Sequence, residues 1–137
     1  MRKNAPIFLA VFVLLASSLA CKAFTPKMSL ENPRMAYDQA GEQTTSTFTP
    51  TDVLYVVADL KNAPKGTTVK ATWIAVDAQD TDPDFNIQEQ TLDVIEDSFS
   101  GTIYFQLSND NAWPVGKYRV EIYLNDNLSQ NVEFNVE

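Results

Sequence analysis

The sequence contains no histidine and a single cysteine among its 137 residues. Without histidine the commonest general base of enzymes is missing, and a lone cysteine cannot close an intramolecular disulfide. Basic residues are also scarce, because 10 Lys and Arg stand against 18 Asp and Glu and give a formal net charge of −8. An acidic chain repels phosphate backbones, so nucleic acid is excluded as an expected partner.

Only one long apolar run is present, at Ile7–Leu15, and it is too short to span a membrane comfortably. It follows the basic residues Arg2 and Lys3 and precedes the small residues 16–18. This order predicts a secretory signal peptide over residues 1–20 and an exported protein.

The segment Ser18-Leu19-Ala20-Cys21 resembles the bacterial lipobox, although Ser18 stands where leucine is commonest. The resemblance implies that Cys21 is lipidated and that the membrane is a partner through a multi-chain lipid anchor. By resemblance to enterobacterial sorting, Lys22 in place of aspartate implies an outer-membrane anchor if the host has that membrane. The alternative is a conventional cleavage near Ala20 that leaves Cys21 as a free thiol.

Residues 21–46 are expected to form the lipidated cysteine, a tether and a first edge strand. The tether covers Lys22–Pro33, with a short strand at Lys27–Leu30 as one option, and the edge strand covers Arg34–Asp38. Gln39–Ser46 is polar and reads either as a loop or as more tether.

From residue 47 onward, apolar and polar residues alternate, which is typical of β-strands with one buried face. The clearest strand is Lys117–Leu124, which follows a turn containing Pro114 and Gly116. The other predicted strands are Val53–Leu60 (central), Thr67–Val76, Ile87–Ile95 (near an edge), Gly101–Leu107 and 131–136. Turns are predicted at Asn62–Gly66 and Asn125–Asn127.

No segment after residue 20 shows a sustained helical period. The expected fold is therefore all-β: an antiparallel immunoglobulin-like (Ig-like) sandwich of about seven strands over residues 47–137. Trp73 is expected to fill the space that a disulfide occupies in antibody domains.

Four features together resemble a class of small exported bacterial proteins: the segment Phe48–Asp52, the turn before Thr67, the strand around Trp73, and the alternation from Trp113 through Val136. Members of that class have a single Ig-like domain, generally of uncharacterised function. The resemblance covers about residues 48–136 and implies the fold, with no catalytic residues.

One loop is rich in aspartate and forms a candidate metal site at Asp77, Asp80, Asp82 and Asp84. Alternating carboxylates open the calcium loop of an EF-hand, but its sixth position here is Phe85 rather than glycine. A looser Ca²⁺ site and a solvated acidic loop both remain open; no other cofactor is expected.

The aromatic residues Trp113, Tyr123 and Tyr104, with Tyr55, form a candidate surface for a glycan or peptide. The competing interpretation is that Trp113 caps the core while Tyr104 and Tyr123 pair across strands.

The leading functional hypothesis is a membrane-anchored envelope lipoprotein. It would act without catalysis, as a binding or structural module that meets an envelope protein or glycan. A Ca²⁺-dependent module is the second hypothesis. A small hydrolase with a carboxylate pair is the third, and it requires two acids facing one another across a cleft.

Overall fold

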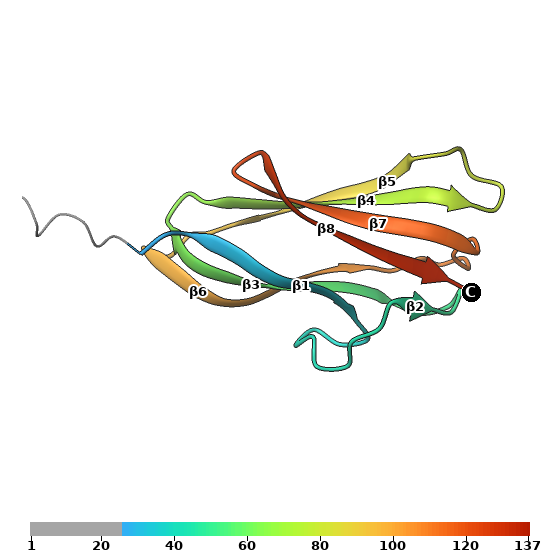
Figure 1. The fold of residues 1–137 in the computed structure, drawn as a ribbon, viewed down its shortest axis with the longest axis horizontal. Helices are drawn as coiled ribbons and strands as arrows, with labels where there is room; N and C mark the ends of the chain where they lie inside the picture. The colour runs from blue at the N-terminus through green and yellow to red at the C-terminus, as the bar shows by residue number, and fades with distance from the viewer. Residues whose placement is uncertain (1–25) are drawn as a thin grey trace, which may run out of the picture.

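The computed structural model describes residues 26–137 as eight strands in two sheets, which confirms the all-β prediction (Figure 1). The predicted signal peptide and Cys21 lie outside the described residues. Within residues 26–137, no helix is present that is long and apolar enough to cross a membrane. The strands are β1 (Ser29–Ala36), β2 (Thr47–Phe48), β3 (Leu54–Pro64), β4 (Thr68–Ala78), β5 (Phe85–Asp93), β6 (Ser98–Leu107), β7 (Gly116–Leu124) and β8 (Asn127–Val136).

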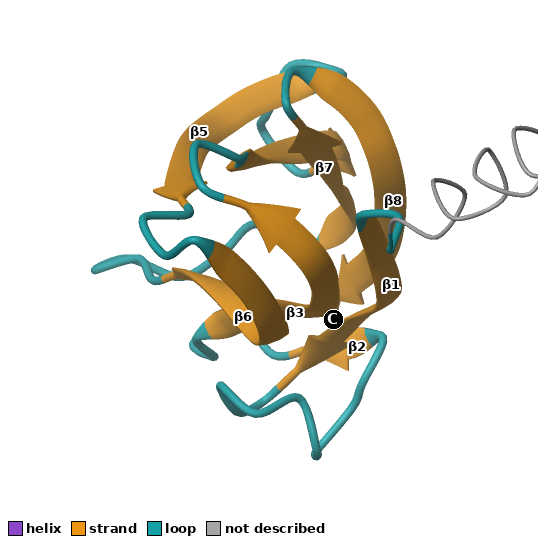
Figure 2. Cartoon of the chain, turned by 90° about the vertical axis from the view of Figure 1, so that its left-hand side faces the viewer, coloured by secondary structure: helices purple, strands orange, loops and turns teal. Residues whose placement is uncertain are grey.

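The two sheets pack as the layers of a sandwich, which is seen from one end in Figure 2. The smaller sheet has the order β1-β3-β6, and the larger has the order β2-β8-β7-β4-β5. All pairings are antiparallel except the short β2–β8 pair, which is parallel. Apart from the two-residue β2, these orders correspond to the A-B-E and G-F-C-C′ strands of immunoglobulin domains, so the sandwich is Ig-like as expected.

The predicted boundary between a tether ending at Pro33 and an edge strand beginning at Arg34 is wrong. Ser29–Ala36 instead forms one strand, β1, which pairs with β3. The register shifts between Glu31 and Arg34, and Asn32 adopts a positive φ of 50°. Proline is tolerated at a bulge in an edge strand, so Pro33 bends β1 without ending it. The packed sandwich therefore includes residues that precede Thr47.

Strand β3 also extends further than the sequence pattern indicated. It runs through Asn62 to Pro64, where a turn was predicted, because a bulge between Leu60 and Ala63 lets pairing with β6 resume. The predicted ranks of two strands are confirmed: β3 is the centre of its sheet, and β5 is an edge. The β7–β8 turn is also as predicted, with Asn125 and Asp126 at φ values of 48° and 66°.

Aromatic side chains fill the middle of the sandwich. The Phe134 ring stacks on Tyr118 with centroids 5.2 Å apart and meets Trp73 and Phe48 edge-on at 6.3 and 5.6 Å. Trp73 is 1% exposed, so it occupies the interior in a chain that has no disulfide available there.

Tyr118 joins this core to the turn that precedes β7. Its hydroxyl donates to the carbonyl of Pro114, a bond of the tyrosine-corner type found at the start of strand F in Ig domains. In the same turn, a Cβ added at Gly116 would collide with the main chain of Asp77 and Ala78. The predicted turn therefore needs glycine for close approach as well as for its φ of 154°.

Removing the Tyr118 hydroxyl tests how much its hydrogen bond to the Pro114 carbonyl contributes to stability. Tyr118→Phe leaves the Pro114 carbonyl without its donor and should lower the free energy of unfolding by about 1–2 kcal/mol. Tyr37→Phe is the control, because that exposed hydroxyl bonds the Thr47 carbonyl at the surface and its loss should cost less. Urea denaturation at neutral pH measures both.

Burial also raises the pKa of Tyr118 above its ordinary value of 10.0. A raised pKa in the folded state contributes stability below pH 10 that is lost as the pH rises beyond it. The difference between wild type and Tyr118→Phe should therefore narrow above about pH 10. If the difference in unfolding free energy between wild type and Tyr118→Phe stays constant above about pH 10, the raised pKa of Tyr118 is contradicted.

Candidate functional site

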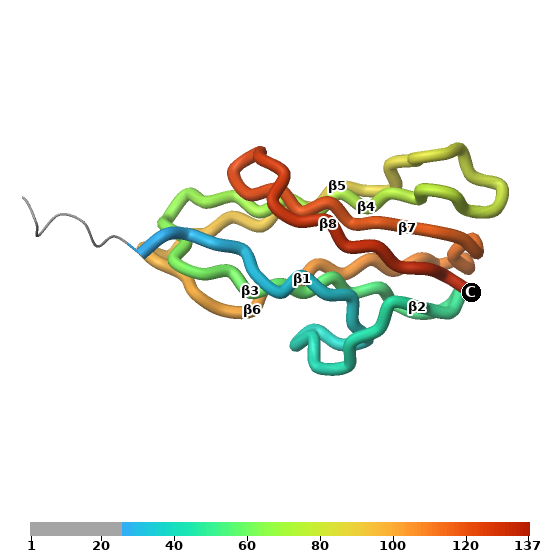
Figure 3. The backbone as a smooth tube through the Cα atoms, viewed as in Figure 1, coloured from blue at the N-terminus to red at the C-terminus, as the bar shows by residue number. Residues whose placement is uncertain are grey.

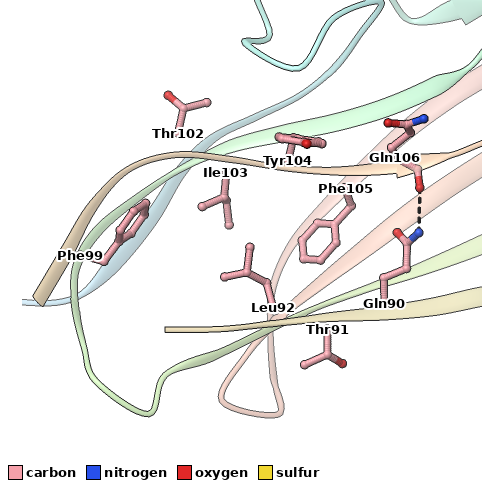
Figure 4. A pocket seen from close by; sticks show the side chains of 9 residues that line it. All are labelled: Gln90, Thr91, Leu92, Phe99, Thr102, Ile103, Tyr104, Phe105 and Gln106. Carbon is pink, nitrogen blue, oxygen red and sulfur yellow. Dashed lines mark hydrogen bonds between the residues drawn. The ribbon is translucent and has the colours of Figure 1, made fainter. Parts of the chain in front are cut away.

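A hollow lies between the free edges of the two sheets, where β5 and β6 face one another (Figure 4). We call it the β5–β6 groove; it has a volume of about 550 Å³. It is lined by Gln90, Thr91, Leu92, Phe99, Thr102, Ile103, Tyr104, Phe105 and Gln106.

The groove follows from the side-chain alternation of its two strands. In β6, Ile103 and Phe105 are buried and point toward β5, while Thr102 and Tyr104 lie on the other side of the strand (Figure 4). Across from them, β5 contributes Leu92 as its inward apolar side chain on this stretch. The weak apolar pattern of β5 therefore leaves this side of the core incompletely covered.

Gln90 joins the two sheets at one end of the groove. Its Oε1 accepts a 2.9 Å hydrogen bond from Nε1 of the buried Trp73, and its Nε2 donates a 2.7 Å bond to the Gln106 carbonyl on β6. One amide thus satisfies the indole of the core and holds the β6 edge against β5.

A second, smaller hollow of about 170 Å³ continues the groove past Leu92, Phe99 and Ile103. It adds Val94 and the strongly exposed Ile95, with Asp93 and Glu96 beside them. Among residues 26–137, no Lys or Arg lines either hollow, and no carboxylate lines the main groove. The β5–β6 groove therefore offers apolar contacts and hydrogen bonds. The end of the groove next to the smaller hollow is acidic, because Asp93 and Glu96 lie there.

The four aspartates of the candidate metal site are all exposed and are not gathered around a common point. Within residues 26–137, no group of three or more His, Cys, Asp and Glu side chains is arranged to hold a metal ion. Asp84 instead pairs with Arg119 at 3.2 Å, and Asp77 lies opposite Lys117 in the β4–β7 register. Asp80 and Asp84 adopt positive φ values of 55° and 53°, as turn residues.

The candidate aromatic residues do not form one surface. Trp113 is 6% exposed, and its Nε1 donates to the Asp52 carbonyl at 3.0 Å, so it closes the end of the core. Tyr104 lies on β6 and Tyr123 on β7, in different sheets, so the expected cross-strand pair between them is wrong. Tyr104 instead neighbours Tyr55 of β3, with centroids 6.3 Å apart.

Tyr123 belongs to a polar cluster on the outer face of the larger sheet. Lys70 Nζ lies 4.7 Å above its ring centroid, and its hydroxyl donates to Glu121 Oε1 at 3.2 Å. Desolvation, followed by the Glu121 charge, raises the pKa of Tyr123. The ring and hydroxyl are thus both engaged within the protein, and only Tyr104 of the three predicted residues lines the β5–β6 groove.

Sequence reasoning missed Leu92, Phe99 and Gln90 as site residues. A signal was available in residues 98–107, SFSGTIYFQL, which contain no charged residue although charged residues make up 20% of the chain. An uncharged strand of this length is unusual at a sheet edge, where charged residues commonly block pairing.

No family model and no curated protein matches the sequence. Similar solved structures include an alkylpurine DNA glycosylase of Pseudomonas fluorescens bound to abasic-site DNA, at 12% identity and TM-score 0.52 over 80% of this chain and 30% of that one. A β-glucosidase of Listeria innocua in complex with glucose has 14% identity and TM-score 0.52 over 80% of this chain and 16% of that one. An immunoglobulin-like protein of Pseudomonas aeruginosa has 14% identity and TM-score 0.42 over 82% of this chain and 98% of that one.

The chain thus spans less than a third of the glycosylase and about a sixth of the glucosidase. At these identities the likeness is one of fold: a β-sandwich that also occurs as part of larger proteins.

The Gln90 bridge can be tested by two substitutions. Gln90→Ala leaves the buried Trp73 N–H without its acceptor and should cost about 1–3 kcal/mol of unfolding free energy. Gln90→Glu keeps an acceptor for Trp73 but turns a second acceptor toward the Gln106 carbonyl, so it should also destabilise at neutral pH.

A protonated glutamic acid can donate to that carbonyl, which raises its pKa in the folded state. The stability of Gln90→Glu should therefore approach that of wild type as the pH falls below about 4. Urea denaturation at pH 7 and pH 4 provides the measurement, and equal stability of all three proteins would contradict the bridge.

Proposed function

We propose that this protein is an exported lipoprotein anchored through Cys21, and that its Ig-like domain is a non-catalytic binding module of the cell envelope. The observation that carries the binding role is the β5–β6 groove, whose floor is apolar and whose lining holds no acid, Lys or Arg. Ligand pockets are typically apolar hollows of about 300–1,000 Å³ with a few placed polar groups. Here the amide of Gln90, at one end of the groove, is such a polar group.

The shape of the domain suits a tether at its N-terminal end. The first described residues and the C-terminus lie at opposite ends of the sandwich (Figure 3). An anchor at Cys21, a few residues before Pro26, would therefore leave the loops at the C-terminal end of the sandwich directed away from the attachment point, with the Ser98 end of β6 beside Pro26. In a host with two membranes, Lys22 supports placement at the outer one.

A hydrolytic function has less support. A carboxylate-pair hydrolase needs two acids about 5–10 Å apart across a cleft, and the lining of the β5–β6 groove supplies none. The likeness to a β-glucosidase concerns a part equal to 16% of that enzyme, at 14% identity, and brings no site residues to this chain.

The anchor has a direct test. Mass spectrometry of the protein isolated from membranes should find a mature N-terminus at residue 21 carrying acyl chains, because stable anchoring takes more than one chain. Cys21→Ser should move the protein to the soluble envelope fraction while the folded domain keeps its melting temperature.

Cys21→Ala serves as a second variant, since both changes remove the thiol and should behave alike. An unmodified Cys21, or a Cys21→Ser protein that stays in the membrane fraction, would contradict the lipoprotein assignment.

A further inference from the structure

The two sheets have four edges, and three of them are protected against pairing with another chain. Strand β1 has a bulge with Pro33, carries Glu31 and Arg34, and has its Leu30 carbonyl covered by Gln130 of β8. Strand β2 has only two residues, and β5 carries Glu89 and Asp93 and has a bulge between Asn86 and Gln88. Short length, charge, proline and bulges are the devices by which natural sheets block edge pairing.

Strand β6 is an edge without these devices. Its ten residues contain no charge and no proline, and five of them are aromatic or β-branched. Between Gly101 and Leu107 its pairing with β3 runs without a register shift. Such an edge presents a row of main-chain donors and acceptors that is ready to pair with an extended segment.

The direction of those main-chain groups can be assigned. The Gln106 carbonyl points away from β3, because it accepts its hydrogen bond from Gln90 of β5. In an antiparallel strand the N–H and C=O of one residue point to the same side, and that side alternates along the chain. Thr102 and Tyr104 therefore direct their N–H and C=O groups to the free edge, while Ile103 directs its groups to β3.

The groove lies where the side chains of an added strand would fall. A strand paired with β6 would lie about 4.8 Å from it and place alternate side chains on the inner face of the sheet. On that face they would meet Ile103, Phe105 and Leu92, which line the groove of about 550 Å³. The Gln90–Gln106 bond closes one end, so the free length runs from Tyr104 back toward Ser98.

Charge identifies the kind of segment that fits. The smaller hollow at this end carries Asp93 and Glu96, and Asp97 follows, while no Lys or Arg lines either hollow. A second copy of this chain would bring the same acidic residues and a net charge of −8 to the contact. A different segment, apolar at every second position and carrying Lys or Arg beside them, has the complementary charge.

From these observations we infer that β6 accepts an added β-strand from a partner polypeptide, an extended segment with alternating apolar residues and basic flanks. This deepens the proposed function and rests on it, since it names the partner class for the same groove. Main-chain hydrogen bonds supply affinity in this mode, and the groove selects the alternating side chains.

The test uses the full-length exported protein and a synthetic peptide of about nine residues, with valine alternating with threonine and lysine at both ends. Amide hydrogen exchange should show the Thr102 and Tyr104 N–H groups protected when the peptide is present and unprotected without it. The Ile103 N–H, which faces β3, is the internal control and should be protected in both states. A second peptide with glutamate at its ends should bind at least about tenfold more weakly.

A matched pair of variants separates the main chain from the side chain. Thr102→Pro removes the edge-facing N–H, whereas Thr102→Ala removes the hydroxyl and keeps that N–H. We expect Thr102→Pro to weaken peptide binding by about tenfold or more and Thr102→Ala to leave it within about threefold. Melting temperatures verify that each variant is folded. If Thr102→Pro does not fold, the hydrogen-exchange measurement on the wild-type protein still tests the inference.

Several outcomes would overturn the inference. These are peptide binding without protection of Thr102 and Tyr104, unchanged binding by folded Thr102→Pro, or equal binding of the glutamate peptide. A wild-type dimer in sedimentation that folded Thr102→Pro dissociates would assign the edge to a second copy instead. If no peptide binds at β6 but Cys21 is acylated, the strand-addition inference fails and the lipoprotein assignment holds. If the peptide protects the β6 edge but Cys21 is unmodified, the lipoprotein assignment fails and the strand-addition inference holds.

Discussion

The structure depends on burying aromatic and aliphatic side chains between two sheets that no disulfide joins. Phe134 is at the centre of this packing, in ring contact with Tyr118, Trp73 and Phe48 from three other strands of the larger sheet. Each aromatic pair adds about 0.5–1.5 kcal/mol beyond the area it buries. The polar atoms of the same cluster are satisfied, because Tyr118 bonds Pro114 and Trp73 bonds Gln90. A continuous apolar interior with satisfied polar groups thus does the work that a B–F disulfide does in antibody domains.

That dependence links the core to the candidate site. The indole of Trp73 points to Gln90, whose amide reaches the β6 main chain, so one hydrogen-bonded path connects the centre of the sandwich to its open side. The path keeps β5 and β6 in place at one end of the groove, and apolar side chains line the groove beyond it. The candidate site is therefore held in one arrangement, which would lower the ordering cost of the proposed association.

The exposed polar clusters have a different role. On the outer face of the larger sheet, Arg119 contacts Asp84 and Glu121, and Lys70 lies over Tyr123. Such surface pairs contribute little to stability individually. They do, however, occupy Asp84 of the candidate metal site and Tyr123 of the candidate aromatic surface with contacts inside the protein. The candidate site accordingly lies beside β6, a strand without charged residues, rather than on the aspartate-rich loop.

The sequence by itself determined which segments are strands and which of their faces are buried, because side-chain alternation is local and has a period of two. It was sufficient for the Ig-like sandwich, the buried Trp73, the central rank of β3 and the edge rank of β5. Only the tertiary structure decided that Pro33 and Asn62 are absorbed by bulges, that Tyr104 and Tyr123 belong to different sheets, and that β6 has a free edge above an apolar groove. These features depend on which strands become neighbours, and strand pairing joins residues far apart in the chain through main-chain hydrogen bonds that carry no local sequence pattern.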